Sequence, residues 1–257
     1  MRHQINYIGL QTLFSKEVRR FLKVPAQTVA QPVVMTTLYF LVFGFSLGGR
    51  VHELDGVPYV RFIVPGLVML ALIQNAFMNT SSSMFVAKLQ GTIVDLLVAP
   101  LSVGELLLAF IVAAIVRGVG VGLIVWLVAA VFTGFDVAHP VWVVVYSVLV
   151  AALFALLGLI VAIWSDKFEQ LNIIPTFIIT PLTFLGGVFY SAKMLPAPWA
   201  TIARMNPILY MVEGLRYGLL NAGEGTVWLG FAMTSALCLA SLGVAWWMLA
   251  TGYKLRN

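Results

Sequence analysis

Six long apolar segments constrain this sequence more than any other feature. They cover approximately residues 29–47, 62–85, 106–132, 141–164, 171–190 and 227–250. A helix needs about 20 mainly apolar residues to cross the roughly 30 Å hydrocarbon core of a bilayer, and each segment has about that length. A membrane barrel would instead alternate polar and apolar residues in units of about 10, and residues 106–116 show no such alternation. The segments therefore predict six transmembrane helices.

The composition supports an integral membrane protein. Of the 257 residues, 61% are hydrophobic and only 10% are charged, against about 25% charged in an average soluble domain. A soluble basic surface for nucleic acid is not available, and a single Cys238 with three scattered histidines predicts no metal site and no intramolecular disulfide. We expect an all-α polytopic protein whose residues 1–257 form one transmembrane domain, with no catalytic residues.

The first 27 residues predict an amphipathic helix. Apolar residues recur from Tyr7 to Phe21 at spacings of three and four, while Lys16, Arg19 and Arg20 lie on another face. We interpret this segment as an interfacial helix whose cations face anionic lipid; an ordinary soluble amphipathic helix is the alternative.

Lysine and arginine in the connections predict the orientation. Nine of them fall on the side of the two termini and five on the opposite side. Because positive residues mark the cytoplasmic side, both termini should be cytoplasmic and residues 49–61, 133–140 and 191–226 should face outward. The last of these contains an amphipathic stretch, 195–220, which predicts a pair of re-entrant helices in the outer leaflet.

Few polar residues interrupt the spans. Asn75, Asn79 and Ser82 recur on one face of the second span, where they could line a translocation path or bind another helix. Arg117 lies near the centre of the third span. It is either a pathway charge or a structural residue, including one that a longer third helix places near the inner interface.

The connection over residues 86–104 is the best candidate for contact with a partner. It predicts a short helix, 92–98, ended by Pro100, with Ser102 capping the next helix through Glu105. An exposed apolar cytoplasmic helix fits a groove on a partner, although it could also lie on lipid. The chain has no G-x-x-x-x-G-K-[S/T] motif, so any ATP that drives transport must bind another polypeptide.

Two stretches resemble a known family. GTIVDLLVAPLS at 91–102 and GGVFYSAKMLPAPWATIARMNPILYMVEGLRYGLL at 186–220 are similar to the permease subunit of type-2 ABC exporters, the group that exports nodulation lipo-oligosaccharides, daunorubicin-type drugs and polysaccharides. The second stretch is the more specific one. It matches the family pattern at Gly187, Phe189, Leu195, Pro196, Asn206, Pro207, Tyr210 and Arg216. Arg117 matches no motif of the family.

The resemblance implies a homodimer in a bacterial inner membrane, joined to two ATP-binding cassette subunits that carry ATP and Mg. These subunits would be contacted by the connection and by the N-terminal helix, through Lys88, Thr92, Asp95, Leu96, Leu97, Pro100, Lys16, Arg19 and Arg20. The residues of the second stretch would form an external gate, and the cargo would be amphipathic or lipid-linked. The alternative function is a secondary transporter or channel that works without ATP, but such proteins usually place acidic residues or histidine inside their spans. A membrane-embedded enzyme ranks third.

Overall fold

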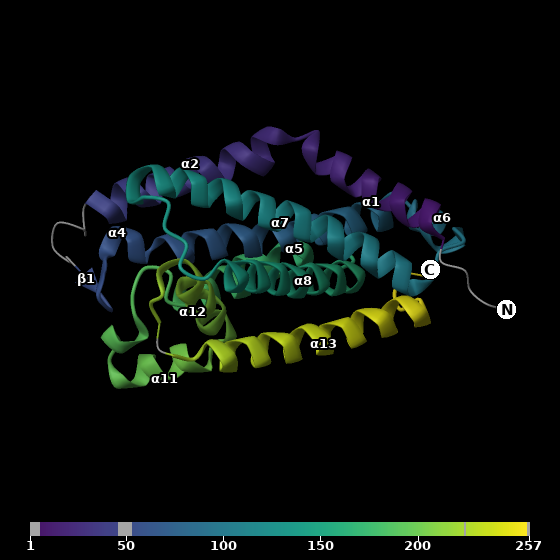
Figure 1. Ribbon diagram of the computed structural model, residues 1–257. Coiled ribbons are helices and arrows are strands. Elements are labelled where there is room, and N and C mark those ends of the chain that lie inside the picture. The colour runs from purple at the N-terminus through teal and green to yellow at the C-terminus, as the bar shows by residue number, and fades with distance from the viewer. Residues whose placement is uncertain (1–5, 46–52, 224, 256–257) are drawn as a thin grey trace.

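The computed structural model describes residues 6–45, 53–223 and 225–255, which form an elongated helical bundle (Figure 1). Within these described residues, six helical segments are long and apolar enough to cross a membrane, which confirms the predicted all-α class. They are Ala26–Gly44, Tyr59–Leu89, Val103–Thr133, Pro140–Trp164, Phe168–Leu185 and Val227–Thr251. The last residues predicted for the first span, 46–47, lie outside the described part of the chain.

The centre of the bundle is the second span, which consists of α4 (Tyr59–Phe62) and α5 (Val64–Leu89). Helix α5 packs against α7 (Val103–Thr133) and α8 (Pro140–Trp164). Glycine allows the closest of these contacts, because a Cβ at Gly158 of α8 would overlap the carbonyl oxygen of Phe77 and the hydroxyl of Thr80 on α5. The Thr80 hydroxyl also donates to the Ala155 carbonyl at 2.7 Å. Small residues thus bring two helix backbones together, as expected inside a membrane.

The first and fifth spans are irregular. The first comprises a π-helical segment η1 (Ala26–Ala30), α2 (Gln31–Tyr39) and a second π-helical segment η2 (Phe40–Phe45). The fifth comprises α9 (Phe168–Ile174), π-helical η3 (Pro175–Ile179) and α10 (Thr180–Leu185). The fifth span ends at Leu185 rather than at the predicted residue 190, because Gly187 takes a φ of +73° that a continuing helix does not allow.

At one end of the bundle, α1 (Tyr7–Leu22) begins, α13 (Val227–Thr251) ends, and α6 (Ile93–Val98) links α5 to α7 (Figure 1). Ser102 and Glu105 form the predicted capping box at the start of α7, and Glu105 also accepts a hydrogen bond from the Asn6 backbone N–H at 2.5 Å. The start of α1 is therefore fixed to the start of α7.

The opposite end carries a two-stranded antiparallel hairpin and a group of short helices. The hairpin pairs β1 (Glu53–Leu54) with β2 (Val57–Pro58). A 3-10 turn η4 (Ala192–Met194) leads to α11 (Ala197–Met205) and α12 (Pro207–Leu220), which are the helix pair that the amphipathic stretch predicted.

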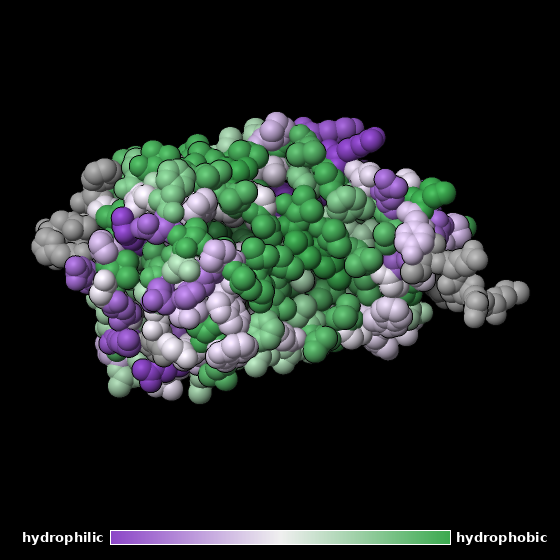
Figure 2. All heavy atoms as spheres, in the orientation of Figure 1, coloured by the Kyte–Doolittle hydropathy of each residue, from purple (hydrophilic) through white to green (hydrophobic). Residues whose placement is uncertain are grey.

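A hydrophobic surface crosses the middle of the molecule on the face shown in Figure 2, and hydrophilic residues collect toward both ends. A soluble protein of this size would not leave so much contiguous apolar surface in contact with water. The distribution fits a bundle whose middle lies in the hydrocarbon core and whose ends reach the headgroups.

Candidate functional site

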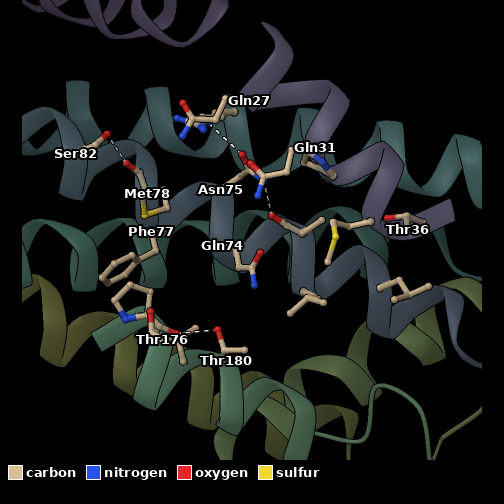
Figure 3. Close-up of a pocket in the computed structure, with 18 of the residues that line it drawn as sticks. Gln27, Gln31, Thr36, Gln74, Asn75, Phe77, Met78, Ser82, Thr176 and Thr180 are labelled. Carbon is tan, nitrogen blue, oxygen red and sulfur yellow. Dashed lines mark hydrogen bonds between the residues drawn. The ribbon is translucent and has the colours of Figure 1, made fainter. Parts of the chain in front are cut away.

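A cavity of about 650 Å³ lies between the first, second and fifth spans. Polar side chains enter it from all three, as Figure 3 shows. Gln27 and Gln31 come from the first span, Gln74 and Asn75 from α5, and Thr176 and Thr180 from the fifth span. The predicted polar stripe on the second span thus lies partly on this wall: Asn75 and Ser82 line the cavity, whereas Asn79 is fully buried beside it.

Two of the three π-helical segments border this cavity. Gln27 of η1 and Thr176 of η3 both contribute to its wall. A π turn departs from the regular i→i−4 ladder of backbone hydrogen bonds and is frequent at functional sites. In η3 the carbonyl of Pro175 accepts hydrogen bonds from both the backbone N–H and the hydroxyl of Thr180, the latter at 2.8 Å.

Arg117 reaches the same cavity from the middle of α7. Only 8% of its surface is exposed. Its Nε donates to Oδ1 of Asn75 at 3.2 Å, and its guanidinium carbon lies 5.9 Å from the ring centre of Phe21. The 31-residue α7 therefore keeps Arg117 at mid-helix and does not carry it to the inner interface.

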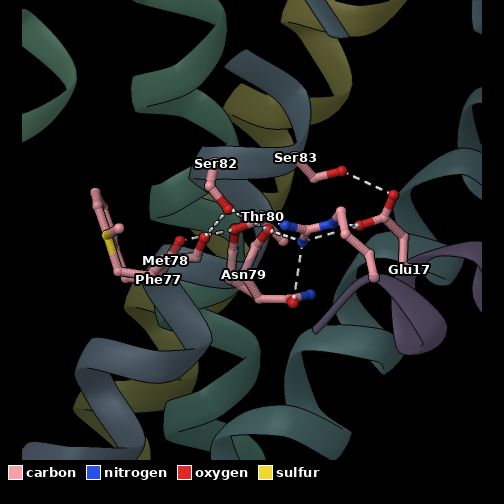
Figure 4. A network of polar contacts seen from close by, with 9 residues as sticks. Glu17, Phe77, Met78, Asn79, Thr80, Ser82 and Ser83 are labelled. Atoms are coloured by element: carbon pink, nitrogen blue, oxygen red, sulfur yellow. Dashed lines mark hydrogen bonds and ion pairs between the residues drawn. The ribbon is translucent and has the colours of Figure 1, made fainter. Parts of the chain in front are cut away.

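A polar network joins α1 to α5 at the edge of the cavity (Figure 4). Glu17 is fully buried and its carboxylate accepts from the Ser83 hydroxyl at 2.7 Å and pairs with Arg20 at 3.1 Å. Arg20 donates to the Asn79 carbonyl at 2.7 Å, to Oδ1 of Asn79 at 3.2 Å and to the Ser82 hydroxyl at 3.1 Å. Arg20, predicted as a contact to a partner, thus points into the bundle, whereas Lys16 and Arg19 are exposed.

The sequence reasoning missed Glu17, Gln27 and Gln31. The predicted apolar stripe of α1 begins at Tyr7, which is 69% exposed, whereas the buried positions are Leu13, Glu17 and Phe21. Their spacing of four residues was the available signal, since a glutamate between two apolar positions of one helix face needs polar partners on the neighbouring helix.

Four aromatic rings form a cluster beside the cavity. Phe189 stacks on Phe43 with ring centres 4.4 Å apart, and it also contacts Tyr39 at 5.4 Å and Phe184 at 5.7 Å. Tyr39 and Phe184 line the cavity as well. Phe189 was a predicted gate residue, and here it lies at the centre of this aromatic cluster.

The other predicted gate residues hold the segment that carries Phe189. Arg216 donates to the Gly187 carbonyl at 2.7 Å, and its guanidinium carbon lies 3.9 Å from the ring centre of Phe62. Asn206 donates to the Leu182 carbonyl at 2.5 Å and caps α12 by accepting from Ile208 N–H at 3.0 Å. Three further residues shape the helix pair: Pro196 precedes α11, Pro207 begins α12, and the Tyr210 hydroxyl donates to the Arg204 carbonyl.

Helix α6 presents a different face from the predicted one. Leu96 and Leu97 are half-buried against the core, whereas Val94 and Val98 are 56% and 78% exposed on either side of the exposed Asp95. Thr92 and Pro100, which bracket this helix, are exposed as well.

Lys88 is an internal anchor of the bundle. Its Nζ donates to the carbonyl oxygens of Ile163 and Ser165 at 3.0 and 2.8 Å and pairs with Asp166 at 3.0 Å. Asp166 also pairs with Lys254 at 2.6 Å. These contacts hold the last turn of α5, which ends at Leu89. The connection between α5 and α7 is therefore shorter than the predicted 86–104.

The fold and the cavity define a polytopic membrane protein with a polar chamber between its spans. Comparison with known proteins narrows this class to one family. The profile of the ABC-2 type transporter family matches residues 9–220. The chain is 38% identical over 251 residues to the inner membrane transport permease YadH of Escherichia coli K12, with 98% of each chain covered. It is 28% identical over 213 residues to nodulation protein J of Sinorhizobium fredii, with 82% of this chain and 78% of that protein covered.

This chain belongs to the ABC-2 type transporter family. It is a permease subunit of a transporter and a multi-pass inner-membrane protein, and permeases of this family normally work with an ATP-binding subunit.

Proposed function

We propose that this chain is the membrane half of an ATP-driven exporter in which two copies assemble with two ATP-binding cassette subunits. Both termini and α6 face the cytoplasm, and the complex moves an amphipathic or lipid-linked cargo outward. The observation that carries this proposal is the polar cavity between the first, second and fifth spans.

The position of the cavity suits a cargo with a polar head and an apolar tail. The first and fifth spans, which flank the cavity, each bury only 17% of their most apolar stretch within this chain. Large apolar side chains are exposed on both of them, including Val34, Leu38 and Phe177. A polar head would occupy the cavity while a tail stays among lipid, and a second copy of the chain would cover the remaining apolar surface.

Helix α6 is the proposed contact with the ATPase. Val94 and Val98 are too exposed to stabilise this chain by itself, and Asp95 lies between them. Lys88 and Asp166 fix the end of α5 next to α6 to the end of α8. A displacement of α6 by ATP-driven closure of the cassettes would therefore reach the core of the bundle as a rigid shift.

Co-purification and reconstitution test the proposal. The full-length chain should co-purify with a P-loop ATPase, and proteoliposomes containing both should move a fluorescent short-chain lipid between leaflets only when ATP is hydrolysed. Movement of that lipid by this chain alone without ATP would overturn the proposal and favour the secondary transporter.

A matched pair of variants tests the α6 contact. Val98→Asp should abolish ATPase association while the permease still elutes as a folded protein, because a carboxylate cannot enter an apolar groove. Val137→Asp makes the same change in the connection at the opposite end, where the valine is 37% exposed, and should leave association intact. Equal association of both variants with the ATPase would refute the assignment.

A further inference from the structure

The cavity carries a net positive charge. Two charged side chains line it, Arg20 and Arg117, and no aspartate or glutamate does so among the described residues. Glu17 neutralises Arg20 from the α1 side. Arg117 has no carboxylate partner within the described chain, where its recorded contacts are the neutral amide of Asn75 and the ring of Phe21.

The stability of the fold does not explain why the cationic side chain of Arg117 is buried at this position. Taking a guanidinium out of water is costly unless an anion compensates it, and α7 is otherwise an apolar membrane helix. An intramembrane charge of this kind usually serves a ligand or a pathway. Because Arg117 is buried and reaches the cavity wall, the compensating anion would be a molecule that enters the cavity.

The two guanidinium groups contact neighbouring turns of α5. Arg117 contacts Asn75 and Arg20 contacts Asn79, on the same helix. These asparagines are one turn apart, which separates them by about 6 Å along α5. Guanidinium groups are planar forks that match the oxygens of phosphate, so a phosphate or diphosphate can accept from both.

We propose that Arg117 and Arg20 bind the phosphate or diphosphate group of the cargo that enters this cavity, so that the exported molecule is anionic at its polar head. The inference rests on the proposed transport function and specifies its substrate class. Gln27, Gln31 and Gln74 supply neutral donors and acceptors around the anion and suit hydroxyl groups attached to it.

Binding to the full-length permease in detergent tests the site without the ATPase. The lipid probes are phosphatidylglycerol and phosphatidylcholine, compared by native mass spectrometry. The soluble probe is inorganic pyrophosphate, measured by its effect on the thermal unfolding temperature. The normal chain should retain phosphatidylglycerol in preference to phosphatidylcholine. Arg117→Gln should weaken this binding about tenfold to a hundredfold, the loss expected when a charge-assisted contact is removed.

The variant Asn75→Asp controls for the possibility that Arg117→Gln loses anion binding only because it does not fold. It keeps both arginines and nearly the same shape, but its carboxylate pairs with Arg117 at the present 3.2 Å contact. We expect a thermal unfolding temperature no lower than normal together with the same loss of anion binding. Arg204→Gln removes an exposed arginine on α11 and is the matched control.

The two probes separate the possible sources of the phosphate. Binding of both, lost in Arg117→Gln and Asn75→Asp, supports a site that recognises the anion itself. Binding of the lipid alone, lost in the same variants, supports a headgroup site that also requires the tail. Anion binding equal in the normal chain and both variants overturns the site, and it does so even if the permease still assembles with its ATPase, so the proposed transport function would stand.

Discussion

The second and fifth spans face each other across the cavity, yet they are built in opposite ways. Of the most apolar stretch of the second span, 83% is buried within the chain, against 17% for the fifth and 17% for the first. The second span packs on α7 and α8 through direct backbone contacts, whereas the first and fifth contain π-helical segments at the cavity.

This difference divides the lining of the cavity into a fixed wall, formed by the second span, and two movable walls, formed by the first and fifth spans. Helices α5, α7 and α8 have small residues at their contacts, which leave little freedom to shift. The first and fifth spans have few contacts to break and irregular turns that absorb bending. We therefore expect the cavity to open and close by motion of these two spans relative to the rigid unit of α5, α7 and α8.

The largest effect should come from a change in the fixed wall. Gly158→Leu would place a side chain where even a Cβ overlaps the Phe77 carbonyl and the Thr80 hydroxyl. Overpacking of this kind typically costs about 1–3 kcal/mol, and more where backbone must move. We expect little folded protein by size-exclusion chromatography. Gly120→Leu lies on α7, where a Cβ meets nothing within 4 Å, and should elute normally; equal recovery of both would show that the wall is not closely packed.

The next effect should arise where α1 is attached to the fixed wall. Glu17→Ala removes a buried carboxylate that binds Ser83 and Arg20, and it leaves Arg20 without its counter-ion. Breaking a buried pair costs about 3–5 kcal/mol; because the Arg20 side chain is 33% exposed, we expect about 2 kcal/mol after screening. Urea unfolding in detergent measures this loss. The exposed Glu169→Ala is the control, and a loss no larger than the control's would refute the attachment.

The sequence predicted the fixed part of the molecule better than the movable part. Long apolar runs determine where helices cross a bilayer, so the limits of the spans were found within a few residues, the largest difference being at the end of the fifth span. Hydropathy does not distinguish α from π turns, so η1 and η3 were not predicted.

The candidate site was predicted in part. Asn75, Asn79, Ser82 and Arg117 were selected because polar groups inside a span are costly. Gln27 and Gln31 lie at the edge of the first apolar segment, where polar residues are ordinary, and their position on the cavity wall depends on tertiary packing. The same packing turns Arg20 inward from a face that helical periodicity had assigned to the surface.

A smaller and opposite effect is expected in the movable wall. Proline inside a helix is about 3 kcal/mol less favourable than alanine. In η3 the hydrogen bond from the Thr180 hydroxyl to the Pro175 carbonyl offsets part of this cost. Pro175→Ala should therefore raise the free energy of unfolding by about 1 kcal/mol, a fraction of that difference. It should also slow ATP-driven transport, because the bend is lost. Pro140→Ala, at the first turn of α8, should change neither quantity much. Lower stability with unchanged transport would refute the hinge.

The smallest effect should come from the ion cluster of Lys88, Asp166 and Lys254 at the α6 end of the bundle. Asp166 itself lies outside the spans. Hydrogen bonds from Lys254 and Lys88 hold the pKa of the Asp166 carboxyl below its usual value. Asp166 therefore contributes stability above a pH of about 4, where the unfolded chain is also ionised. This contribution is lost as the pH falls through the depressed pKa. Asp166→Asn should lower the thermal unfolding temperature slightly at pH 7, and its difference from the normal chain should shrink as the pH falls below about 4. A pH-independent difference for Asp166→Asn would show that the cluster stabilises the fold by packing rather than by charge.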